Sequence, residues 1–153
     1  MNQAGKLERI WIKLGRKGPM DNRERAVFVA AEGLVDNIHQ GSKGGKRQVT
    51  LLDAGRWEEA TSILAGPVDP IARRANLLLS GVDLFESEGR VLRVGACRVL
   101  IRGETKPCGR MDEAVPGLRE ALVDKWGGGA YGEVLDSGDV CVGDAVLWEP
   151  SGS

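Results

Sequence analysis

The side chain with the clearest chemical potential is Cys108, which lies in a Pro-Cys-Gly turn with Lys106 and Arg110 two positions away on either side. Nearby cations stabilise a thiolate over a thiol, and a loop position leaves the sulfur accessible. A thiolate attacks disulfides and persulfides and coordinates soft metals. Cys108 is therefore a candidate functional cysteine, with an inert, half-buried thiol as the alternative.

The other two cysteines, Cys97 and Cys141, stand inside apolar runs, where cysteine behaves as a small hydrophobic residue. Both are predicted to belong to the core. The spacing of the three cysteines fits no Cys-x-x-Cys zinc pattern. An odd number of cysteines in a chain without a recognisable export signal also argues against a disulfide framework.

The only histidine is His39, in a polar, glycine-containing stretch over residues 36–41. A lone histidine excludes multi-histidine zinc and iron sites. Serine hydrolysis is also unsupported, because the sequence has no Gly-x-Ser-x-Gly elbow. Imidazole groups titrate near neutral pH, so His39 is either an acid–base or hydrogen-bonding partner or a loop histidine without catalytic duty.

Basic side chains gather in two short stretches that could bind an anion. They are Arg73 and Arg74 beside Asn76 in one stretch, and Lys43, Lys46 and Arg47 in the other. Guanidinium and ammonium groups supply donors for phosphate or another oxyanion, although solvated loops explain such charges as well. The Gly127–Gly129 triplet either exposes backbone N–H groups to an anion or serves as a hinge or helix end.

Short β-rich runs bounded by turn residues are the main signal of secondary structure. They predict strands over residues 7–14, 26–30, 48–52, 90–94, 97–102, 131–135, 140–142 and 145–148, and residues 76–79 form a further short apolar run. Helical spacing predicts helices over 56–64 and 115–126, with one further turn over 70–75. Many short strands and few helices favour a barrel over a layered parallel sheet, and no strand–GxGxxG–helix unit supports a Rossmann nucleotide site.

The composition is that of a folded globular chain: 153 residues, of which 42% are hydrophobic and 28% charged. This length predicts one domain over residues 1–153, with its core over about 6–149. The net charge of −1 excludes a protein that coats nucleic acid non-specifically, although the first 50 residues carry ten basic and five acidic side chains. No apolar run approaches the ~20 residues that cross a bilayer, so we expect a cytoplasmic protein without membrane contact.

Several short motifs, taken in order, resemble the MOSC domain, the module named after the C-terminal part of molybdenum-cofactor sulfurases. They are residues 18–20, 33–41, 46–53, 73–77, 80–84, 94–95, 106–111, 132–135 and 138–144. The resemblance covers roughly residues 6–149 and implies a mainly β, barrel-like fold with two or three short helices. It also implies that the cysteine next to proline, Cys108, either carries sulfur as a persulfide or ligates molybdenum in a bound pterin cofactor.

Basic and polar side chains hold the pterin and its phosphate in family members that bind the molybdenum cofactor (molybdopterin). The positions of this sequence that match are Arg73, Arg74 and Asn76, followed by Lys46, Arg47 and His39. The chain has no recognisable lysine site for pyridoxal phosphate. Sulfur would therefore come from a partner cysteine desulfurase, and any reductase activity would need a separate electron-donor protein.

Three functions remain open at this point. One is a cofactor-binding domain that reduces N-hydroxylated small-molecule substrates, with Cys108 as the metal ligand. Another is a persulfide sulfur carrier for metal–sulfur cofactor assembly. The last is a non-enzymatic module that binds an anion or cofactor. The sequence favours cofactor-linked chemistry over pure binding.

Overall fold

The structure is a computed structural model that describes residues 4–15, 19–38, 45–64, 66–107 and 110–150. The strands are β1 (Gly5–Lys13), β2 (Met20–Arg23), β3 (Arg25–Val29), β4 (Gly33–Leu34), β5 (Val49–Asp53), β6 (Leu77–Ser80), β7 (Val91–Val94), β8 (Cys97–Glu104), β9 (Ala130–Val134), β10 (Gly138–Cys141) and β11 (Ala145–Trp148). The helices are α1 (Ala54–Thr61), α2 (Arg110–Ala114) and α3 (Leu118–Ala121), with 3-10 turns η1 (Pro70–Arg73) and η2 (Asp124–Trp126).

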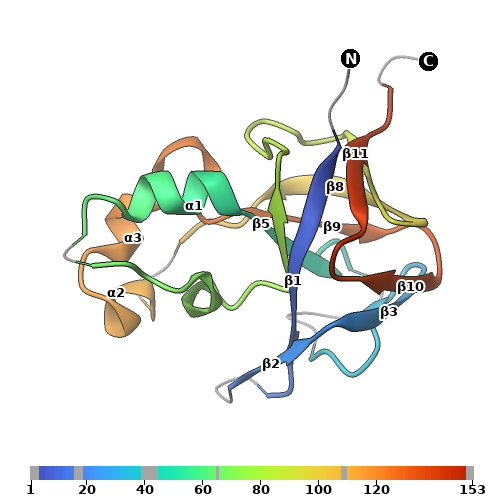
Figure 1. Cartoon of the computed structure of the whole chain (residues 1–153), viewed down its shortest axis with the longest axis horizontal. Helices are drawn as coiled ribbons and strands as arrows, with labels where there is room; N and C mark the ends of the chain where they lie inside the picture. The colour runs from blue at the N-terminus through green and yellow to red at the C-terminus, as the bar shows by residue number, and fades with distance from the viewer. Residues whose placement is uncertain (1–3, 16–18, 39–44, 65, 108–109, 151–153) are drawn as a thin grey trace.

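Seven strands close into a barrel in the order β1-β11-β7-β8-β9-β5-β6, and β2 extends the wall beside β1. All neighbouring strands are antiparallel except β5 and β6, which are parallel. The first residues of β1 pair with β11, and its later residues pair with β6 and β2. The first and last strands of the chain therefore complete the barrel side by side (Figure 1).

Side chains alternate between the two faces of the barrel wall, as the pleat of a strand requires. On β6, Leu77 and Leu79 point into the barrel core, whereas Leu78 points outward. On β5, Leu51 likewise points into the barrel core and Leu52 points outward. The outward side chains form a second core with Trp57 and the other apolar residues of the helices, which lie together on one side of the barrel (Figure 1).

A separate three-stranded sheet, in the order β10-β3-β4, lies at one end of the barrel (Figure 1). Its β10 pairs with β3 over Gly138–Cys141, although these two strands are more than 100 residues apart in sequence. Val140, Ala26 and Phe28 belong to the barrel core. The small sheet therefore closes the barrel with apolar side chains.

The predicted fold class, a mainly β barrel with short helices, is confirmed, and so is each predicted strand to within a few residues. The single helix predicted over 115–126 is wrong. Only α3 and η2 form there, because Pro116 lacks a donor and Gly117 (φ 86°) and Lys125 (φ 51°) have left-handed backbone conformations. The strands β2 and β4 were not predicted, and β6 forms where the sequence showed a short apolar run. None of the helices in the described ranges has the length and apolar character needed to cross a membrane.

The two cysteines predicted to belong to the core differ in how deeply the structure buries them. Cys97 is fully buried, and burial, with the nearby carboxylates, raises the pKa of its thiol. This thiol therefore stays protonated and inert near neutral pH. The prediction is wrong for Cys141, which is only half-buried because it ends a strand of the small outer sheet.

Candidate functional site

Basic side chains from three segments meet where β1 ends and β5 and β6 begin. They line a small cleft of about 20 Å³, which we call the cation cleft. Its lining consists of Lys13, Asn37, Ile38, Arg47, Gln48, Val49, Thr50, Arg74 and Asn76. Three of these described lining residues are cationic and none is acidic. Such a cleft has the electrostatic character of an anion site.

Lys13 is the most unusual member of the cation cleft, because its side chain is only 8% exposed. It is the last residue of β1 and follows Ile12, which faces the barrel core. The alternation of the strand therefore turns Lys13 outward, toward the cleft. Its backbone N–H donates to Asn37 Oδ1 at 2.8 Å, which ties the end of β1 to the segment after β4.

The two arginines of the cation cleft come from segments that precede β5 and β6. The guanidinium of Arg47 lies over the ring of Tyr131, with 4.8 Å from Cζ to the ring centroid. Arg74 follows η1 in a left-handed conformation (φ 61°), and its Nη2 donates to the carbonyl of Gly15 at 3.2 Å. Each guanidinium is thus oriented by the protein, which lowers the entropy cost of binding an anion.

Asn76 also lines the cleft, and it connects β1, β5 and the segment after β4. Its Oδ1 accepts from the N–H and the hydroxyl of Thr50, and its Nδ2 donates to Trp11 O and Asn37 Oδ1. Both amide hydrogens and both oxygen lone pairs are therefore engaged within the protein. The structure thus gives Asn76 a positioning role, since its amide has no donor left for a ligand.

Replacing Asn76 with alanine is expected to lower the free energy of unfolding by about 3 kcal/mol, because buried partners of its amide lose their hydrogen bonds. Urea denaturation measures the change. Asn22→Ala is the matched control, since Asn22 is exposed on the neighbouring strand β2 and its loss should change stability by less than about 0.5 kcal/mol. Equal stability of the two variants would contradict the positioning role.

Arg73 points away from the cation cleft, although it is adjacent to Arg74. Its Nε donates to the carbonyl of Gly128 at 2.8 Å, and its Nη2 donates to the carbonyl of Thr105 at 3.2 Å. The N–H of Thr105 donates in turn to the carbonyl of Gly129. Arg73 thus fastens the segment that leads to residue 108 onto the glycine triplet.

The glycine triplet is required by close packing. A Cβ on Gly128 would lie 2.7 Å from the carbonyl oxygen of Thr105, and one on Gly129 would overlap the carbonyl oxygen of Leu51. The N–H groups of Gly127 and Gly129 donate to carbonyls of their own loop. These two groups are therefore already engaged, so close chain contact explains the triplet better than an anion cradle does.

The remaining sequence candidates are not joined to the cation cleft in the described structure. Lys46 is exposed and does not line the cleft. Cys108 and His39 lie outside the described residues. The flanks of the Cys108 position are described: Arg73 donates to the carbonyl of Thr105, and α2 packs against η1. In the same described ranges, no cluster of three or more His, Cys, Asp or Glu could hold a metal ion.

Sequence reasoning missed Lys13 and Asn37 as members of the cleft. The signal for Lys13 was its position in the alternation of the strand. It shares a strand face with Trp11, whereas Ile10 and Ile12 lie on the opposite face. A lysine that shares a strand face with a buried tryptophan is a candidate for burial. Asn37 carried no comparable signal, because its contacts come from β1 and Asn76, which are distant in sequence.

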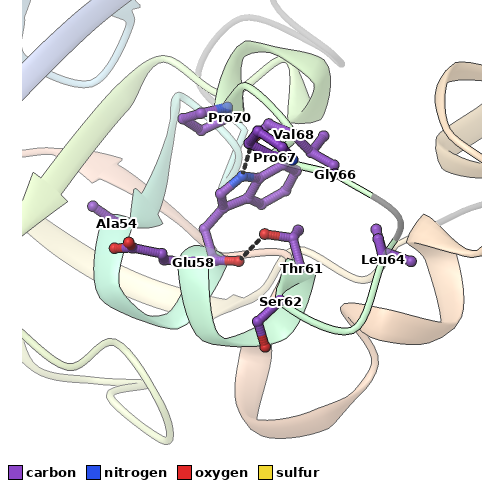
Figure 2. A pocket seen from close by; sticks show the side chains of 10 residues that line it. Ala54, Glu58, Thr61, Ser62, Leu64, Gly66, Pro67, Val68 and Pro70 are labelled. Carbon is purple, nitrogen blue, oxygen red and sulfur yellow. Dashed lines mark hydrogen bonds between the residues drawn. The ribbon is translucent and has the colours of Figure 1, made fainter.

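A larger cavity, which we call the apolar pocket, lies between α1 and the segment that follows it (Figure 2). Its volume is about 530 Å³. It is lined by Ala54, Trp57, Glu58, Thr61, Ser62, Leu64, Gly66, Pro67, Val68 and Pro70. Since its described lining contains no cation, this pocket differs in chemistry from the cation cleft.

Residues 35–147 match the model of the MOSC domain family. The chain belongs to the MOSC domain family. Solved structures similar to this MOSC domain include the YuaD protein from Bacillus subtilis, with a TM-score of 0.78 and 21% identity over 94% of each chain. No curated protein is similar enough in sequence to count as a relative.

Two further neighbours of this MOSC domain are YiiM proteins. The one from Geobacillus stearothermophilus has a TM-score of 0.68 and 16% identity, over 95% of this chain and 75% of its own. The one from Escherichia coli has a TM-score of 0.66 and 12% identity, over 97% and 71%. At such low identity, these neighbours support the fold alone.

Proposed function

We propose that this MOSC domain binds the molybdenum cofactor, with the phosphate of the pterin in the cation cleft. The observation that carries the proposal is the meeting of Lys13, Arg47 and Arg74 in a cleft whose described lining has no carboxylate. Guanidinium and ammonium donors match phosphate oxygens in both charge and hydrogen bonding. Membership of the MOSC family supports the molybdenum cofactor as the source of this phosphate.

The size and chemistry of the cleft fit one end of the cofactor. About 20 Å³ of free space is room for about one ordered water, so a phosphate would place one of its oxygens there, and a pterin ring system would not fit. The apolar pocket is large enough for a ring system, but its described lining offers no cation to a phosphate. The cation cleft therefore fits an oxygen of the phosphate, and the rest of the cofactor would extend beyond it.

Cys108 is the proposed ligand of the molybdenum, since a thiolate is a soft ligand. Arg73 supports this role indirectly, because it joins the carbonyl of Gly128 to that of Thr105, three residues before the cysteine. When bound, the cofactor supplies two-electron redox chemistry, for which we propose N-hydroxylated small molecules as substrates. The electrons would come from a separate donor protein.

Molybdenum and phosphorus content tests the proposal. The protein is purified without oxygen from a host that makes the cofactor, and Cys108→Ser is compared with the wild-type chain. Wild-type protein is expected to hold near-stoichiometric molybdenum, and Cys108→Ser at least about tenfold less, equivalent to about 1.4 kcal/mol. Cys141→Ser is the matched control and should retain the metal, because Cys141 belongs to the small outer sheet.

Two results would contradict the proposal. Full metal content in Cys108→Ser would show that Cys108 is not a ligand of the molybdenum. Absence of molybdenum from every variant would overturn cofactor binding. In that case, a mass increase of about 32 Da on Cys108 after incubation with a cysteine desulfurase would identify a persulfide carrier instead.

A further inference from the structure

The apolar pocket has the dimensions of a small-molecule site. Its volume of about 530 Å³ falls within the range of about 300–1,000 Å³ found for ligand pockets. Trp57 is 3% exposed, and its indole joins the second core. Leu64 and Val68 pack against the same core. These contacts indicate a preformed cavity with apolar walls.

The polar hydrogens of the side chains that line the apolar pocket are largely engaged in hydrogen bonds within the protein. Trp57 Nε1 donates to the carbonyl of Val68 at 2.8 Å, and the Thr61 hydroxyl donates to the carbonyl of Trp57 at 2.8 Å (Figure 2). The Ser62 hydroxyl donates to the carbonyl of Glu59 at 2.7 Å. The side chains therefore offer acceptors to a ligand, so its polar group must be a donor.

The charge of the apolar pocket also selects a donor. Among the described lining residues, Glu58 is the charged one. Arg56 is the one cation of α1, and its guanidinium faces Glu59 and Asp83, each at 3.6 Å. A carboxylate ligand would meet an unfavourable negative charge at Glu58, whereas an ammonium group would meet a favourable one.

The polar and apolar parts of the pocket are separated in space. Figure 2 shows Glu58 beside Ala54 at one end and Leu64 at the other, with Pro67, Val68 and Pro70 facing α1. A ligand with one ammonium end and one hydrocarbon end matches this arrangement.

We propose that the apolar pocket binds a small apolar primary amine, with its ammonium group at Glu58 and its hydrocarbon part against Trp57, Leu64 and Val68. This site is distinct from the cation cleft, which is lined by other residues. It does not depend on the molybdenum cofactor, and the probes below need no cofactor. Failure of one proposal would therefore leave the other standing.

Three probes of similar size test the proposal: 2-phenylethylamine, 2-phenylethanol and 3-phenylpropanoate. Binding is followed by titration calorimetry and by the NMR signal of the Trp57 indole N–H, identified among the four tryptophans with Trp57→Phe. The amine is expected to bind most tightly and the carboxylate least. Glu58→Gln should lower the affinity for the amine roughly three- to fivefold and leave that for the alcohol unchanged.

Glu59→Gln is the matched control, because Glu59 follows Glu58 on α1 but does not line the pocket. It should leave amine binding unchanged. The proposal is overturned if the carboxylate binds as tightly as the amine, or if both variants weaken the amine equally. The proposal is also overturned if the amine at millimolar concentration does not shift the NMR signal of the Trp57 indole N–H.

Discussion

A Lys13→Met variant is expected to retain at least about tenfold less molybdenum and phosphorus than the wild-type chain, a loss of about 1.4 kcal/mol or more in binding. Lys13 is buried, whereas Arg74 is half-buried and Arg47 is exposed. A charge acts more strongly where water is excluded, and a hydrogen bond to a charged group contributes about 1.5–3 kcal/mol. Lys13 should therefore contribute more to anion binding than either arginine.

The expected loss can be separated from a folding defect. Methionine keeps an apolar stem of similar length, and the melting temperature of Lys13→Met is measured beside its metal content. A melting temperature close to that of the wild type would assign the loss to binding rather than to folding. Lys6→Met is the matched control, since Lys6 is exposed near the start of the same strand.

Phosphate binding gives a second readout for Lys13 that needs no molybdenum. Cofactor-free protein is titrated with inorganic phosphate and followed by ³¹P NMR. Binding should weaken in Lys13→Met and persist in Lys6→Met. If Lys13→Met binds phosphate and retains the metal as the wild type does, the cation cleft is not the phosphate site.

Gly129→Ala is expected to lower the free energy of unfolding by about 3 kcal/mol or more. Gly129 has φ 96°, a conformation that costs an L-residue about 1–2 kcal/mol, and its added Cβ would overlap the carbonyl oxygen of Leu51. Overpacking of this kind adds about 1–3 kcal/mol. In a chain of this size, the melting temperature should fall by roughly 6–12 °C.

Gly55→Ala provides the matched control for this substitution. Gly55 lies in α1, and an added Cβ would be 3.5 Å from Asp53 Oδ1, an ordinary contact. Alanine favours helix over glycine by up to about 1 kcal/mol, so this variant should be as stable as the wild type or more so. A wild-type melting temperature for Gly129→Ala would show that β5 and the glycine triplet do not pack as closely as described.

Strand positions could be predicted because the signal is local. The 7–14 run alternates in hydrophobicity, and the structure forms β1 over Gly5–Lys13. The 145–148 run is β11 with the same bounds. A strand that is buried on one face must show this period of two, whatever it pairs with. The sequence also placed the turn that separates β7 from β8.

Pairing between distant segments could not be predicted. Nothing in the 138–142 run indicates that β10 leaves the barrel to pair with β3, because pairing depends on backbone groups that every residue has. The same holds for the divergence of Arg73 and Arg74, which follows from the left-handed turn at Arg74. Two adjacent arginines look like one anion site in sequence, but here only Arg74 lines the cleft.

By itself, the sequence determined the mainly β fold class, most strands and the family, because local periodicity and short motifs carry that information. Only the tertiary structure decided which polar groups meet: Lys13, Arg47 and Arg74 line one cleft, and the amide of Asn76 in the same cleft is fully engaged. The physical reason is that burial and hydrogen-bond saturation are properties of neighbours in space. Closing the barrel brings together residues that are tens of positions apart in the chain.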